Sequence, residues 1–147
     1  MGVEMRGLQL LGCIGLALML FQADARAATN CPSQTPNVPG PYYVFFDVGS
    51  TKINAAGMKE VKEAAQRAKA LYITRVCMLG KADKQGDEKL NAALSVKRAQ
   101  AVADAMVKEG VNPKYIIVVG KGEPYGDWLK LLEDNSNDRS VKITLAK

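Results

Sequence analysis

Strand-type and helix-type segments alternate along most of the chain, and this order limits it to a small set of folds. Tyr42 to Val48 is an almost continuous run of β-branched and aromatic residues, which predicts a strand covered on both faces. Further strands are predicted over residues 72–79, 115–119 and 140–145. The last of these alternates apolar and polar residues, as a half-exposed edge strand does.

Helix signals lie between these strands. Asn54 can cap a helix in which apolar residues recur at helical spacing. Asp87 and Glu88 favour the start of a second helix, and Gly110 marks its end. A brief helix is also predicted around residues 127–133. The order β-α-β-α-β-(α)-β predicts an α/β fold, a two-layer sandwich with helices packed on one mixed sheet.

The second helix carries polar residues on its apolar side. At 3.6 residues per turn, Asn91 and Arg98 fall within about 20° of each other, on the side that also carries Leu94 and Val102. A guanidinium beside buried surface needs a partner, because an unpaired desolvated charge is costly. Asp83 lies on the loop before this helix. An acid and an arginine so placed suit the binding of a small zwitterion.

Residues 1–27 predict a secretory signal peptide. Arg6 precedes an apolar run from Leu8 to Phe21, and a small-x-small sequence ends at Ala27. The run has 14 residues, whereas a membrane span needs about 20. Retention as an uncleaved anchor is the alternative. Cleavage would deliver the protein to the periplasm or cell envelope.

Residues 28–41 form a proline-rich lead-in, which we expect to be extended and unable to pair as a central strand. Cys31 is its expected anchor. An exported chain can oxidise Cys31 and Cys77 to a disulfide, which would tie the lead-in to the sheet. Such a bridge would stabilise the fold by about 4 kcal/mol in the chain-entropy model. The alternative is two unpaired thiols, with Cys77 packed as a small hydrophobe.

The composition excludes several kinds of chemistry. The chain has no histidine, which removes Ser-His-Asp and Cys-His catalysis and the common zinc sites. We therefore expect no enzymatic activity and no metal. Gly120 and Gly122 lack the third glycine and the following helix of a dinucleotide loop, so no nucleotide or other cofactor is expected. A formal net charge of +5 does not by itself indicate a nucleic-acid partner, and none is expected.

Five motifs, in order, resemble those of the OmpA-like peptidoglycan-binding domain family. This family occurs in outer-membrane proteins, peptidoglycan-associated lipoproteins and flagellar stator proteins. The motifs are Phe45-Phe46-Asp47, Gly80-x-x-Asp83, Asn91-x-x-Leu94-Ser95-x-x-Arg98-Ala99, Gly120-x-Gly122-Glu123 and Asp138-Arg139-x-Val141-x-Ile143. The resemblance covers nearly all of residues 42–147, which we predict to form one domain with the OmpA-like fold.

The resemblance implies noncovalent binding of cell-wall peptidoglycan through the diaminopimelate of its stem peptide. Asp83 and Arg98 match the two principal ligand-binding positions of the family, and Asn91 and Asp47 match secondary positions. Arg98 would bind the carboxylate of the ligand and Asp83 its ammonium. We expect Arg139 to support the same pocket.

The chain departs from the family pattern at two places. Gly80-Lys81-Ala82-Asp83 stands where the family usually has Gly-His-Thr-Asp, and Ser140 stands where a second arginine is common. An alternative function is therefore a periplasmic scaffold of the same fold, with weakened or lost peptidoglycan binding and with envelope proteins as partners. Asp83 and Arg98 would then form only an internal salt bridge, and Asp47 would merely cap a turn.

Overall fold

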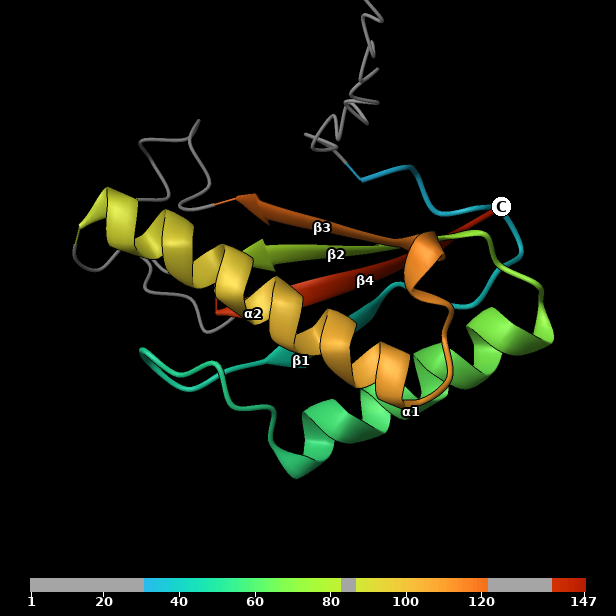
Figure 1. Cartoon of the computed structure of the whole chain (residues 1–147), viewed down its shortest axis with the longest axis horizontal. Helices are drawn as coiled ribbons and strands as arrows, with labels where there is room; N and C mark the ends of the chain where they lie inside the picture. Colours follow the sequence, from blue (N-terminus) through green and yellow to red (C-terminus); the bar gives the residue numbers. More distant parts are fainter. Residues whose placement is uncertain (1–30, 83–86, 122–138) are drawn as a thin grey trace, which may run out of the picture.

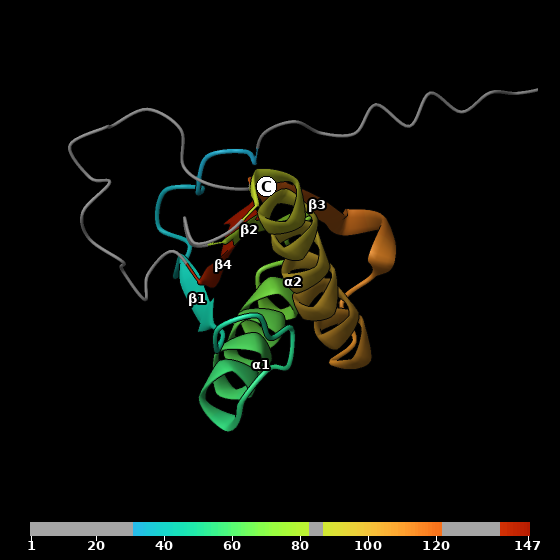
Figure 2. The same cartoon turned by 90° about the vertical axis from the view of Figure 1, so that its left-hand side faces the viewer.

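The computed structural model describes residues 31–82, 87–121 and 139–147. Two helices lie on one face of a four-stranded sheet of order β1-β4-β2-β3 (Figure 1), and Figure 2 shows the two layers from the end. The elements are β1 (Tyr42–Phe45), α1 (Ala55–Ala70), β2 (Arg75–Lys81), α2 (Glu88–Lys108), the 3-10 turn η1 (Pro113–Tyr115), β3 (Ile116–Lys121) and β4 (Ser140–Ala146). The predicted α/β two-layer sandwich is confirmed. The predicted signal peptide and the brief helix at 127–133 lie outside the described residues.

The last strand, β4, lies in the middle of the sheet. It pairs antiparallel with β1 on one side and with β2 on the other, while β2 and β3 are parallel. Val141 and Ile143 are fully buried in the helix-covered core, and Thr144 on the opposite face is only 3% exposed. The prediction of a half-exposed edge strand is therefore wrong. Thr144 lies opposite Cys77 in the register, on the face over which the lead-in passes.

The first strand, β1, is an edge strand instead. Tyr42 and Val44 are buried against the helices, but Tyr43 and Phe45 are 41% and 43% exposed. Their rings stack on the opposite face, with centroids 6.4 Å apart. The prediction of a strand covered on both faces is wrong because aromatic residues also favour the exposed face of a sheet.

Both helices begin where the sequence predicts. The Asn54 side chain accepts a hydrogen bond from the Gly57 N–H at 2.8 Å, and the Asp87 carboxylate accepts from the Lys89 and Leu90 N–H groups. These bonds satisfy amide groups that have no partner within the first turn. The cap residues thus fix the starts of α1 and α2.

Both helices also end in the same hydrogen-bond pattern, a Schellman motif, which places one residue in the left-handed region. In α2 that residue is Gly110, with φ +91°, and in α1 it is Tyr72, with φ +52°. Glycine adopts this conformation freely, whereas a side chain makes it costly. The bonds run from Ile73 N–H to Ala68 O and Tyr72 N–H to Lys69 O after α1, and from Val111 N–H to Met106 O and Gly110 N–H to Val107 O after α2.

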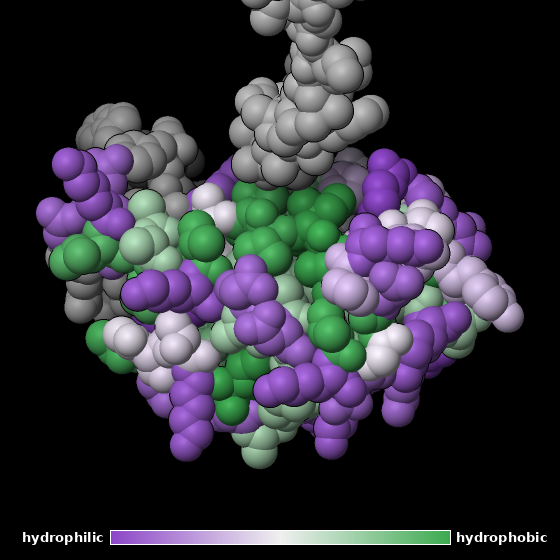
Figure 3. Space-filling view, in the orientation of Figure 1, coloured by the Kyte–Doolittle hydropathy of each residue, from purple (hydrophilic) through white to green (hydrophobic). Residues whose placement is uncertain are grey.

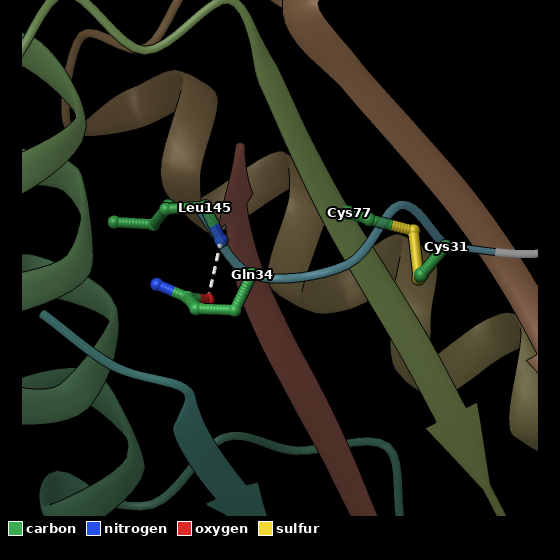
Figure 4. The surroundings of a disulfide bond; sticks show 4 residues. All are labelled: Cys31, Gln34, Cys77 and Leu145. Carbon is green, nitrogen blue, oxygen red and sulfur yellow. Dashed lines mark hydrogen bonds between the residues drawn. A yellow bond between two sulfur atoms is a disulfide. The ribbon is translucent and has the colours of Figure 1, made fainter. Parts of the chain in front are cut away.

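The predicted disulfide between Cys31 and Cys77 is confirmed, with a Cα–Cα distance of 5.6 Å (Figure 4). The lead-in has further anchors. The Leu145 N–H donates to Gln34 Oε1 at 3.1 Å, and the Thr35 N–H donates to the Leu145 carbonyl at 3.3 Å. These bonds satisfy the N–H and carbonyl of Leu145, which lies beyond the last β4 residue that pairs with β1. A side-chain amide and one backbone N–H thus replace a strand that the prolines forbid.

Candidate functional site

Helix α2 lies unusually close to the sheet where β2 and β3 end. Gly80 and Gly120 are paired in the register at this point. A Cβ atom on Gly80 would lie 2.0 Å from the Ser95 carbonyl oxygen, and one on Gly120 would lie 2.3 Å from Val96 Cγ2. The two motif glycines therefore allow a close helix-to-strand approach. This packing brings the first half of α2 to the carboxyl ends of β2 and β3.

The Arg98 side chain is fully buried on the sheet-facing side of α2, three residues after Ser95. Its guanidinium is fully buried and donates to three backbone carbonyls. Nε bonds to the Ser50 oxygen at 2.9 Å, Nη2 to the Asp47 oxygen at 3.0 Å and Nη1 to the Lys81 oxygen at 3.3 Å. The group also lies over the Phe46 ring, 5.4 Å from its centroid. One side chain of α2 thus joins the loop after β1 to the end of β2.

The prediction that Arg98 faces the core and needs a partner is confirmed. The carbonyls hydrogen-bond the buried cation, and the aromatic face adds a cation–π contact. A guanidinium keeps its charge at neutral pH, and a poorly screening interior strengthens its interaction with charged groups nearby. The arrangement can therefore hold the loops in place and attract an anionic group.

The other predicted site residues lie around this centre to different degrees. Asp47 has an exposed side chain, while its carbonyl accepts from Arg98 and from the Ser50 N–H at 3.0 Å. Asn91 is 6% exposed and lies on α2 two turns before Arg98. Arg139 is half-buried, and its carbonyl accepts from the Phe46 N–H at 2.9 Å. Asp83 lies outside the described residues.

Two participants were missed by sequence reasoning. Ser50 contributes only its carbonyl oxygen, which every residue has, so its type carries no signal for this role. Phe46 is buried to 5% exposure beneath the guanidinium, whereas the sequence pattern indicates only its place in a strand. The turn that Asp47 and Ser50 close does have a signal, because Gly49 between them adopts φ +65°.

Two further observations concern the described parts of the chain. Residues 31–82, 87–121 and 139–147 contain no cluster of three His, Cys, Asp or Glu side chains that could bind a metal ion. None of the helices in these ranges combines the length and the apolar character that a bilayer crossing requires.

The fold and the glycine-bounded arginine site define a two-layer domain of the OmpA-like type. The model of the OmpA family matches residues 45–141, which is more than half of the chain, and the chain belongs to this family. The resemblance expected from the five motifs is therefore confirmed at the level of the family.

Two curated relatives show what this chain is similar to. Outer membrane protein A from Bordetella avium is 30% identical over 103 residues, which are 69% of this chain and 53% of the relative. Peptidoglycan-binding protein ArfA from Mycobacterium bovis is 34% identical over 100 residues, which are 68% of this chain and 28% of the relative. The chain thus spans at most about half of the length of these relatives. Their names place them in the cell envelope or on its wall polymer.

A solved structure supports the fold. The crystal structure of the peptidoglycan-associated lipoprotein from Burkholderia pseudomallei has a TM-score of 0.61 to this chain at 23% identity. The superposition covers 71% of this chain and 90% of that one. Almost the whole of that lipoprotein structure therefore corresponds to the two-layer domain described above.

Proposed function

We propose that this protein binds cell-wall peptidoglycan noncovalently, through the diaminopimelate of the stem peptide, in the periplasm. Membership of the OmpA family and similarity to a protein named for peptidoglycan binding support the polymer as ligand. The observation that carries the site is the burial of Arg98, whose guanidinium gathers the carbonyls of Asp47, Ser50 and Lys81.

Arg98 and Asp83 are the proposed centre of the ligand site. The Lys81 carbonyl contacts Arg98, and Asp83 follows Lys81 by two residues. The Cα atoms of Lys81 and Asp83 can be at most about 7 Å apart, because each residue extends the chain by no more than about 3.6 Å. A ligand carboxylate would be attracted by the Arg98 charge, and the ligand ammonium would pair with the Asp83 carboxylate. Diaminopimelate offers both groups.

The other three residues have supporting roles in this proposal. Asn91 can donate to one ligand group and accept from another, from the same side of α2 as Arg98. Asp47 presents an exposed carboxylate on a loop whose backbone Arg98 holds. Arg139 supports the Phe46 end of the site through its backbone. A single solvated ion pair contributes only about 0.2 to 1 kcal/mol, so tight attachment would come from many weak contacts along the polymer.

Co-sedimentation of the exported protein with purified peptidoglycan tests the proposal. Asp83→Asn keeps the size of the side chain and removes its charge, and the loss of one solvated ion pair should weaken binding by about two- to fivefold. Asp104→Asn is the matched control, since Asp104 is an exposed acid on the outer side of α2. Equal binding by wild type and the Asp83 variant would exclude the proposed site.

A scaffold that has lost the ligand is the second candidate function. Two observations favour it. Ala82 is fully buried and brings no hydroxyl where the family usually has threonine, and Arg98 has a structural role through its three bonds to backbone carbonyls. Titration with diaminopimelate, followed by amide chemical shifts, separates the two functions. Saturable shifts at residues 47–50 and 81–98 indicate the binding protein, and their absence indicates the scaffold.

The departure at Lys81 and Ala82 can be tested directly. A Lys81→His, Ala82→Thr double variant restores the usual family residues. A sharp rise in peptidoglycan binding would show that the natural protein is a weakened binder. Unchanged strong binding would show that these two positions do not limit the affinity.

We further propose that the protein reaches the periplasm by cleavage of a signal peptide and has no catalytic activity on the wall. The mass of the mature protein tests the first part, since cleavage after Ala27 gives a chain that begins at Ala28. Incubation of the purified protein with peptidoglycan tests the second part. Release of soluble muropeptides would contradict it.

A further inference from the structure

Tyr72 occupies a position where its side chain opposes folding. It has φ +52° at the end of α1, while Gly110 occupies the equivalent position at the end of α2. The Tyr72 ring is 87% exposed, so the protein gains almost no apolar burial from it. A residue that strains the backbone and adds no packing suggests a role outside the fold.

A pocket of about 270 Å³ lies beside this ring. Its lining is mainly apolar, with Ile73 and Val111 from the two helix ends and the rings of Tyr72 and Tyr115. An exposed tyrosine beside an apolar pocket is typical of the anchors that dominate protein interfaces. The pocket belongs to the end of the molecule at which α1 and α2 finish and β2 and β3 begin (Figure 1). The Arg98 site is at the opposite end of these strands.

The charges around the pocket are mostly positive. Residues 68–74 and 108–115, which end at the pocket, contain three lysines and one glutamate. Lys69 lines the pocket, and its Nζ donates to the Glu109 carbonyl at 2.7 Å. Lys114 Nζ lies 4.9 Å from the centroid of the Tyr115 ring. Hydrophilic side chains frame this end in the space-filling view (Figure 3). An acidic ligand is therefore favoured over a basic one.

We propose that this pocket binds an acidic peptide segment of a partner protein. An apolar side chain of the segment enters the pocket, the Tyr72 ring packs over it, and flanking carboxylates pair with the lysines. A pocket fits a side chain better than it fits a flat lipid surface. A second copy of this chain is disfavoured, because it would bring another positively charged surface to the same place. Since the pocket is remote from Arg98, the partner and the wall could be bound together.

The probe for this proposal is a pair of synthetic peptides added to the full exported protein. The acidic peptide is acetyl-Glu-Glu-Leu-Trp-Glu-Glu-amide, and the control replaces each glutamate by lysine. We expect the acidic peptide alone to give saturable amide shifts, confined to residues 68–74 and 108–115. Binding should be unchanged in the Asp83→Asn variant, so that failure of the wall site and failure of this pocket are distinguishable.

The variant Tyr72→Gly separates recognition from folding. It relieves the left-handed strain, so the melting temperature should rise by roughly 3–6 °C, while the affinity for the acidic peptide should fall at least fivefold. Tyr43→Ser, which removes an accessible ring from β1, should leave peptide binding unchanged. A lower melting temperature for Tyr72→Gly would overturn the proposal, because the ring would then serve the fold.

Other results would also overturn it. The first is equal binding of the basic peptide, and the second is the absence of a saturable shift with either peptide. The third is Tyr72-dependent binding to anionic phosphatidylglycerol vesicles without peptide binding, which would assign the surface to a membrane. The fourth is a Tyr72-dependent increase in mass with protein concentration, which would assign it to a second copy.

Discussion

Two side chains at opposite ends of the parallel strands β2 and β3 differ in burial and in their effect on the fold. At the carboxyl end, Arg98 is fully buried and bonds to three carbonyls, so that it joins the loop after β1 to the end of β2. At the amino end, Tyr72 is exposed, and the backbone adopts an unfavourable conformation to carry it. We therefore expect Arg98 to serve both stability and binding, and Tyr72 to serve binding at a cost in stability.

The largest effect is expected at the arginine end. Arg98→Ala removes the guanidinium bonds to three loop and strand carbonyls and leaves a cavity under α2, which should lower the free energy of unfolding by about 3–5 kcal/mol. Urea unfolding of the purified protein measures this change. Lys97→Ala, an exposed neighbour on the same helix, should change stability by less than about 0.5 kcal/mol. A loss below about 1 kcal/mol for Arg98→Ala would contradict the claim that Arg98 stabilises the fold.

The second largest effect is expected from the disulfide, which lies on the sheet between these two ends. Cys31 and Cys77 are 46 residues apart, and Cys77 is fully buried on β2 between the two ends. Reduction should lower the free energy of unfolding by about 2–4 kcal/mol, chiefly by releasing the unfolded chain from a closed loop. Thermal unfolding with and without reductant measures the change. A Cys31→Ser, Cys77→Ser double variant that is insensitive to reductant provides the control, and a reductant effect in that variant would contradict the assignment.

The glycines at the arginine end provide a smaller and more specific test. Gly80→Ala would place a Cβ 2.0 Å from the Ser95 backbone oxygen, so α2 must shift away from β2, at a cost of about 1–3 kcal/mol. Because α2 carries Arg98, we expect peptidoglycan binding to weaken as well. Gly49→Ala is a useful control, since a Cβ at that position would have no atom within 4 Å and only the φ of +65° is strained. It should therefore retain α2 packing, as amide shifts of residues 95–99 can show.

The features that the sequence predicts well are those set by nearby residues. Asn54 and Asp87 cap the helices as expected, because a cap needs only the next three amides. Helical periodicity likewise places Arg98 on the buried side of α2. Its partners could not be foreseen, because backbone carbonyls are common to all residues and are brought together only by the fold.

The exchange of edge and centre between β1 and β4 has a different cause. The two strands lie near opposite ends of the described chain, and their order in the sheet depends on pairing across that distance. The alternation in β4 is real, but Thr144 is small enough to be covered on the face near the disulfide. The alternation of apolar and polar residues along a strand does not show which polar residues other parts of the chain will cover. The role of Asp83 stays a prediction.

The smallest effect, and the only stabilising one, is expected at the tyrosine end. Tyr72→Gly should raise the free energy of unfolding by about 1 kcal/mol, because glycine adopts the left-handed conformation without a steric penalty. Gly110→Ala is the matched experiment at the end of α2. It places a side chain on a residue with φ +91°, where glycine has no steric penalty. It should therefore lower the free energy of unfolding by about 1 kcal/mol. Opposite signs for the two variants in urea unfolding would show that the helix ends share one backbone requirement. If both variants destabilised the protein, the Tyr72 ring would have to contribute to folding despite its exposure, and the contrast with Arg98 would disappear.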